Sequence, residues 1–121
     1  LLSHPHEIHA DGSLSLFTDV YPGDELVLMV GSRGALVERT DQVAARAGRS
    51  AGALRGGILI YCGGCVGAIG DDAGTVARRF YDRIGQAPYI GAATFGEQGC
   101  FTGETTMNRH GNLMCDAILF E

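Results

Sequence analysis

The sequence contains no lysine and no tryptophan, and its nine basic residues are all arginines. Without lysine the chain cannot form a Schiff base with a carbonyl compound, so this kind of covalent catalysis is excluded. The formal net charge is −5, and the arginines form no basic cluster. Because nucleic acids and anionic membrane surfaces are held by several converging cations, neither is expected as a partner.

Long apolar runs and catalytic sequence motifs are also missing. The longest weakly apolar stretch, 56–70, is too short and too rich in glycine to span a bilayer, and the N-terminus lacks the pattern of a secretory signal. We find no nucleophile elbow, no phosphate-binding loop and no dinucleotide fingerprint. The chain begins with Leu1 rather than methionine, so we expect it to be a fragment of a longer protein.

What the sequence does contain indicates one folded domain over residues 1–121. Its length suits a single domain, and 45% hydrophobic residues are enough to build a core. Glycine is abundant, at 19 of 121 residues, and falls mostly at the expected ends of helices and strands, which indicates tight turns. The four cysteines are too few and too late in the chain for a disulfide framework, so we expect reduced thiols in the cytoplasm.

Apolar periodicity predicts a mixed α/β (α+β) domain. We expect a central mixed sheet of five or six strands with two main helices, in which strands and helices alternate as βαβ units. The 25–30 run, ELVLMV, is predicted to be a strand buried on both faces. The expected strands are 8–10, 14–17, 25–30, 57–61, 88–95 and 113–120. The expected helices are 31–48 and 70–85. Ser32 should begin the first helix and Gly48 should end it, and Asp71 or Asp72 should cap the second.

The pair Cys62 and Cys65 follows the predicted strand 57–61 and allows three interpretations. The favoured one is that both are buried cysteines, because the helix is expected to begin only at Gly70, about one turn of loop after the pair. A second is a thiol redox pair, in which a helix N-terminus would lower a thiol pKa. A third is a structural zinc site, although zinc usually takes two close ligand pairs and only one is present. Its further ligands would come from Cys100, Cys115 or the histidines His4, His6, His9 and His110.

The segment 91–97, Gly-Ala-Ala-Thr-Phe-Gly-Glu, is the stronger candidate for a site. Its small residues allow close approach of a ligand or another backbone, and Gly96 permits a sharp exit from the strand. Glu97 then places a carboxylate at the strand end, which is where ligands bind in open α/β sheets. The Glu97 carboxylate would hold an amino group or accept a proton. Alternatively, it would only accept hydrogen bonds from the backbone N–H groups of its own loop.

The order of these features resembles the C-terminal domain of the FIST family. The resemblance covers most of the chain and is strongest from 57 to 121, where Ile60-Tyr61-Cys62, the segment 91–97 and Asn108 fit the family pattern. It implies a cytoplasmic, bacterial sensory domain of signal transduction that binds a small ligand, such as an amino acid, without a cofactor. It also implies an N-terminal FIST domain and a downstream signalling protein as partners, and a ligand that acts by shifting a conformational equilibrium.

One position departs from the family pattern. The family commonly has an arginine three residues after the first cysteine, where this chain has Cys65, so an anion contact is missing or another arginine such as Arg109 supplies it. Two other functions remain open: a thiol redox or metal-binding module at Cys62 and Cys65, and a non-catalytic interaction domain with an exposed apolar patch. The residues we expect to contact the ligand are Cys62, Thr94, Gly96, Glu97 and Asn108.

Overall fold

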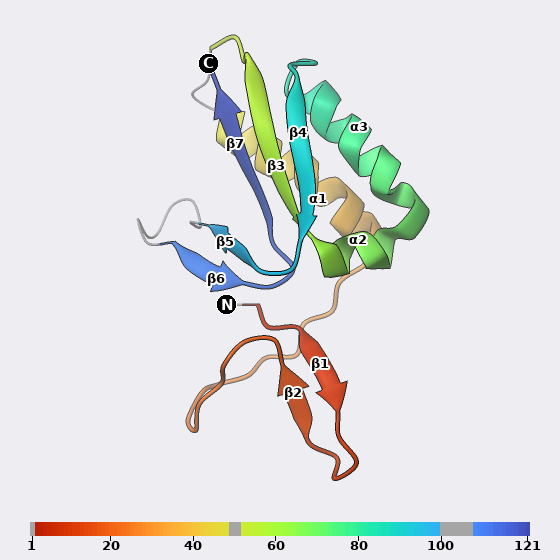
Figure 1. Ribbon diagram of the computed structural model, residues 1–121, viewed down its shortest axis with the longest axis vertical. Coiled ribbons are helices and arrows are strands. Elements are labelled where there is room, and N and C mark those ends of the chain that lie inside the picture. Colours follow the sequence, from red (N-terminus) through yellow and green to blue (C-terminus); the bar gives the residue numbers. More distant parts are fainter. Residues whose placement is uncertain (1, 49–51, 100–107) are drawn as a thin grey trace.

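The computed structural model describes residues 2–48, 52–99 and 108–121. It shows a mixed α/β chain, which confirms the predicted fold class (Figure 1). None of the described helices is long and apolar enough to cross a membrane. In chain order the elements are β1 (Pro5–Ile8), β2 (Leu14–Leu16), α1 (Arg33–Ala47), β3 (Gly56–Cys62), α2 (Gly63–Ile69), the 3-10 turn η2 (Gly70–Asp72), α3 (Ala73–Arg83), β4 (Tyr89–Thr94), β5 (Glu97–Gly99), β6 (Arg109–Gly111) and β7 (Cys115–Phe120).

The described strands divide into three small sheets rather than joining in one sheet of five or six. The central sheet has the order β4-β3-β7, with β4 parallel and β7 antiparallel to β3. β1 and β2 form the predicted hairpin around Asp11-Gly12, and β5 and β6 form a second hairpin. Figure 1 shows the β1–β2 hairpin standing away from the central sheet, and the β5–β6 hairpin beside the start of β7.

The helices cover one face of the central sheet. One buried cluster joins Ala44 of α1 and Phe80 of α3 to Leu59 of β3. A second cluster joins Tyr61 of β3 to Cys65 of α2 and Val76 of α3. Alternate residues of each strand point to opposite faces, so the other face carries Ile58, Ile90 and Ile118, which lie opposite one another in the pairing.

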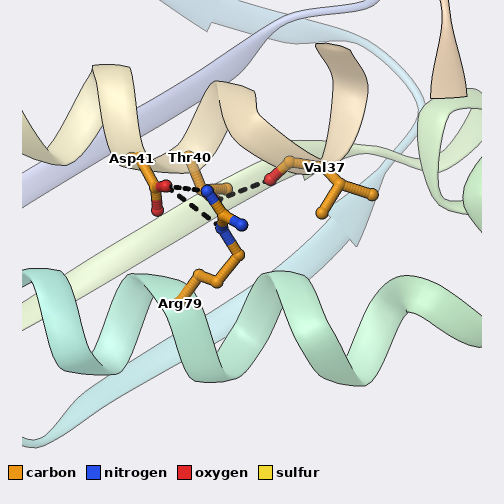
Figure 2. Close-up of polar contacts among 4 residues, drawn as sticks. All are labelled: Val37, Thr40, Asp41 and Arg79. Atoms are coloured by element: carbon orange, nitrogen blue, oxygen red, sulfur yellow. Dashed lines mark hydrogen bonds and ion pairs between the residues drawn. The ribbon is translucent and has the colours of Figure 1, made fainter. Parts of the chain in front are cut away.

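The two long helices begin and end close to the predicted positions. Ser32 caps α1, because its hydroxyl accepts a hydrogen bond from the Ala35 amide at 3.1 Å, and the helix ends at Gly48. α3 buries the stripe that includes Val76 and Phe80. Figure 2 shows the polar contact between the helices, where Asp41 of α1 accepts hydrogen bonds from Arg79 of α3, the Nε bond at 3.0 Å, and the buried Thr40 hydroxyl donates to the Val37 carbonyl.

The prediction of a buried strand at 25–30 is wrong. These residues form neither helix nor strand in the structure, and the side chains from Leu26 to Val30 are 67–93% exposed. β3 already has β4 on one edge and β7 on the other, so this segment does not pair beside β3. The βαβ unit that forms is β3-α2-α3-β4, and no described strand of the central sheet precedes α1.

The expected loop between Cys65 and Gly70 is also wrong, because α2 begins directly after Cys62. Its two glycines have low helix propensity, but the short helix buries Cys65 and Ile69 completely, and this packing outweighs the propensity. Asp72 occupies the N-cap position of α3 without a side-chain capping bond. Its carboxylate instead accepts a hydrogen bond from Arg33 Nε at 2.7 Å and so ties α3 to the start of α1.

Candidate functional site

The carboxyl ends of β3 and β4 lie side by side. Cys62 pairs with Thr94, the last residue of β4. Gly63 begins α2 where an added β-carbon would lie 3.1 Å from the Thr94 carbonyl oxygen, so a larger residue would have to push the two chain segments slightly apart. The chain then turns at Gly96, which has φ +105°, and enters β5 at Glu97. The structure therefore brings together four of the five predicted site residues: Cys62, Thr94, Gly96 and Glu97.

Glu97 is almost completely buried, with 1% of its surface exposed. The Thr94 hydroxyl donates a hydrogen bond to Glu97 Oε1 at 3.1 Å. Oε2 is also buried and has no hydrogen-bond partner within the described part of the chain. A buried carboxylate oxygen without a partner is costly, which makes Glu97 a candidate for contact with a ligand.

Asp116 of β7 is a second carboxylate at this place, half-buried in the structure, and no pattern in the sequence singles it out. It lies opposite Ile60, close to the carboxyl end of β3, and packs against Gly99 of β5. Its Oδ2 atom is buried and has no hydrogen-bond partner among the residues described. Burial and the charge of Glu97 raise the pKa of Asp116 above its ordinary value of 3.8.

The two carboxylates make this place suitable for a cation. Each has a buried oxygen without a hydrogen-bond partner among the described residues, and two like charges close together repel one another unless a proton or a positive group lies between them. The described residues contain no group of three or more His, Cys, Asp or Glu side chains arranged to hold a metal ion. An ammonium group, which donates three hydrogen bonds, is a cation whose chemistry suits the pair.

Two cysteines near the site, Cys65 and Cys115, have raised pKa values. Burial, with the nearby Cys62, raises the pKa of Cys65 to about 12. Burial, with the charge of Asp116, raises the pKa of Cys115 to about 12. A redox pair needs a lowered pKa in only one of its two thiols, so the raised pKa of Cys65 excludes Cys65 as the attacking thiol and leaves Cys62, at the N-terminus of α2, as the candidate for that role. Cys100, a proposed zinc ligand, lies outside the described residues.

An arginine of α1 places a positive charge near Cys65 and Cys115. Arg39 of α1 donates a hydrogen bond to the Leu113 carbonyl oxygen, and its positive charge opposes the rise in pKa of Cys65 and Cys115. Sequence reasoning did not select Arg39, because a single arginine on an amphipathic helix gives no signal of what it faces. The side chain of Arg109, which we expected to act here, lies outside what the structure describes.

Asn108, the fifth predicted site residue, is exposed and lies just before β6. Glu97 pairs with Gly111, so Asn108 is three positions along the hairpin from Glu97, or about 10 Å. The buried amide nearby in sequence is Asn112, whose Oδ1 accepts a hydrogen bond from the His4 backbone N–H at 3.0 Å. Asn112 thus anchors the N-terminal segment to the end of the β5–β6 hairpin.

Replacing Asp116 with asparagine is expected to stabilise the protein at neutral pH by on the order of 1 kcal/mol, because a half-buried charge near Glu97 is removed. The raised pKa means that the folded state binds a proton more readily than the unfolded state. Wild-type stability therefore falls as pH rises from about 3.8 through the raised pKa, and the advantage of Asp116→Asn disappears at acid pH.

Urea unfolding of both proteins between pH 3 and pH 8 measures this difference. Asp82→Asn, at an exposed position of α3, is the matched control and should leave the pH profile unchanged. An Asp116→Asn variant that is less stable than the wild type at pH 7 would contradict the interpretation.

Comparison with known proteins agrees with the resemblance inferred from the sequence. Residues 1–100 match the FIST C domain family, which is most of the chain. No curated protein and no solved structure matches the chain. The chain therefore belongs to the FIST C domain family, which is associated with sensory domains of signal transduction.

Proposed function

We propose that this domain senses a small ligand that carries an ammonium group, an amino acid or a related metabolite, and that the ligand binds at Glu97 and Asp116. The observation that carries the proposal is the Glu97 carboxylate, which is 1% exposed and lies near Asp116, each with a buried oxygen that has no partner in the described part of the chain. An ammonium group placed between them would satisfy both oxygens with charge-assisted hydrogen bonds and relieve their repulsion. Thr94 would position Glu97 through its hydrogen bond to Oε1.

Ligand entry requires a movement of the chain, because Glu97 is closed off from solvent. Glu97 begins β5 and Asp116 lies on β7, so separating the β5–β6 hairpin from β7 opens the space between the carboxylates. Gly96, with φ +105°, supplies a joint at which β5 can turn relative to β4. A bound ligand would favour the conformation in which both carboxylates meet its ammonium group over the closed one, which is the population shift a sensor needs.

The proposal also places the domain in the cytoplasm. It gives the domain two partners, an N-terminal FIST domain and a downstream signalling protein. The family relationship supports them. A turn at Gly96 would fit these partners, because a movement of the β5–β6 hairpin would change a surface to which a neighbouring domain could bind. The domain itself would then transmit the presence of the ligand without making or breaking a covalent bond.

A thermal-shift screen followed by calorimetry tests the proposal. Amino acids are compared with matched compounds that carry only the carboxylate or only the amine, for example alanine with propionate and ethylamine. We expect stabilisation by compounds with an ammonium group and none by propionate. Glu97→Gln should weaken binding roughly 10- to 100-fold, because a hydrogen bond to a charged group contributes about 1.5–3 kcal/mol.

Glu38→Gln, at an exposed position of α1, is the matched control and should bind as the wild type does. A ligand that stabilises the wild type and Glu97→Gln equally would show that Glu97 has no part in binding. Stabilisation by propionate alone would show that the site takes an anion, and the role of the carboxylate pair would be wrong.

A further inference from the structure

One edge of the central sheet is unpaired. β4 is hydrogen-bonded to β3 on one side, and no described strand lies on its other side (Figure 1). The middle of β4, Gly91, Ala92 and Ala93, is exposed, and so is Ile90. Free strand edges of this kind bind further strands unless charged residues, proline or covering loops protect them, and β4 has none of these residues.

An apolar groove of about 500 Å³ runs beside this edge. α3 forms one wall with Val76 and Ala77, and β4 forms the other with Gly91 and Ala93. The groove exists because Gly91 and Ala93 have little or no side chain to place under the helix. A strand added next to β4 would place every second side chain in this groove and the others beside Ile90 on the open face.

The chain carries a segment suited to this place. Residues 25–30 have the sequence ELVLMV, and the five apolar side chains from Leu26 to Val30 are 67–93% exposed. The segment forms neither helix nor strand, is not paired with any described strand, and has the same length as β4, which is six residues. Five exposed apolar side chains in a row are unusual on a free surface and indicate a binding segment.

The segment does not reach this edge within its own chain in an antiparallel orientation. It is joined to α1 by Gly31 and Ser32 alone, and α1 begins at the carboxyl end of β3, where the Tyr61 hydroxyl donates to the Leu36 carbonyl at 2.7 Å. An antiparallel strand would end at the opposite end of the sheet, and two residues do not span the roughly 20 Å back to α1.

A parallel orientation within the same chain fails for a different reason. α1, α2 and α3 all cover the same face, because Leu36, Cys65 and Val76 pack in one cluster with Tyr61. The connection from segment 25–30 to β3 would cross this face in the direction opposite to the connection from β3 to β4. The two crossovers would then have opposite hands, whereas about 98% of such crossovers are right-handed.

We infer that the free edge of β4 binds residues 25–30 of a second copy of this chain. The free edge of β4 in the second copy binds residues 25–30 of the first, so the two chains exchange strands reciprocally around a twofold axis. Each exchange adds one strand to a central sheet, fills the apolar groove beside α3 and covers the exposed side chains of the segment. The interaction is independent of the ligand proposed at Glu97.

Sedimentation equilibrium of the chain over a hundredfold range of concentration tests the inference. We expect a monomer–dimer equilibrium. Leu28→Asp and Ala92→Arg should each raise the dimer dissociation constant by at least about tenfold, because each places a charge in the new interface. A mixture of the two variants should dimerise. In the mixed dimer, the segment of the Leu28→Asp copy binds the β4 edge of the Ala92→Arg copy, which pairs the two new charges. The other segment and the other β4 edge are both wild type. Ile8→Asp, an equally exposed apolar position on β1, should dimerise as the wild type does.

Hydrogen exchange identifies the surfaces. The amides of 25–30 and of the outer edge of β4 should become protected together as the protein concentration rises. A wild type that stays monomeric throughout, or a mixture of the two variants that stays monomeric, would overturn the inference. So would protection of 25–30 that does not depend on concentration, because it would place the strand within its own chain.

Discussion

Replacing Phe80 with alanine is expected to lower the free energy of unfolding by roughly 3–5 kcal/mol, the range for a large aromatic side chain removed from a core. Phe80 is completely buried on α3 and belongs to the cluster that joins Ala44 of α1 to Leu59 of β3. Its ring also meets Tyr89 of β4 edge to face, with centroids 4.9 Å apart. The variant therefore loses contacts to α1, β3 and β4 at once.

Urea unfolding followed by circular dichroism measures this loss. Tyr81→Ala is the matched control, because Tyr81 is the next residue of the same helix and is 38% exposed, so its free energy of unfolding should change by no more than about 0.5 kcal/mol. Phe80→Leu should recover part of the loss, since it restores apolar volume. A loss below about 1 kcal/mol for Phe80→Ala would mean that α3 is not held to the sheet through this residue.

The elements that the sequence predicts well are those whose signal is local. α1 has a serine that caps its start and a glycine at its end, and α3 has an apolar stripe that recurs every three or four residues. β3 and β4 are short runs bounded by glycine and proline, and the helices between them imply a parallel pair. Each of these features depends on neighbouring residues and survives in the folded chain.

The two errors in the fold come from interactions that no local pattern records. The run 25–30 has the composition of a buried strand, but whether a strand forms depends on a free sheet edge within reach of the chain. α2 begins with two glycines that are typical of a loop, and only the burial of Cys65 and Ile69 makes it a helix. In both cases tertiary contacts, or their absence, decide the structure.

Of the two carboxylates in the candidate site, only Glu97 could be predicted from the sequence. Glu97 follows a strand and a glycine, and this position at a strand end signals a site. Asp116 gives no such signal, because a single aspartate in an apolar strand is also found on solvent-facing positions. Its role follows from the antiparallel pairing of β7 with β3, which places it near Glu97 and against Gly99. A long-range pairing of this kind is not readable from one sequence.

Gly99→Ala is expected to damage the carboxylate site and to destabilise the protein by roughly 1–3 kcal/mol, the range for overpacking. A β-carbon on Gly99 would lie 2.9 Å from Asp116 Cγ and closer still to Oδ1, so the Asp116 side chain must move. Aspartate is short and has little freedom to move without shifting β7. The displacement also separates the two carboxylates, so the proposed amine ligand should bind at least about tenfold more weakly.

Gly91→Ala is the matched control for this substitution. Gly91 is also a strand glycine, but an added β-carbon would meet its nearest neighbour at 3.5 Å, an ordinary contact. We expect Gly91→Ala to be neutral or to stabilise the protein by about 0.4–1 kcal/mol, because alanine restricts the unfolded chain. It should leave ligand binding unchanged.

The double variant Gly99→Ala/Asp116→Ala distinguishes a clash with the carboxylate from a general effect on β5. If the clash is with Asp116, removing that side chain makes room for the new methyl group, so Gly99→Ala should cost almost nothing in the Asp116→Ala background. The difference between the two backgrounds is the interaction energy of the pair, which urea unfolding of the four proteins yields as a double-mutant cycle. An equal loss in both backgrounds would show that β5 requires glycine at position 99 for its backbone and not to accommodate Asp116, and the carboxylate would then be free to move when β5 separates from β7.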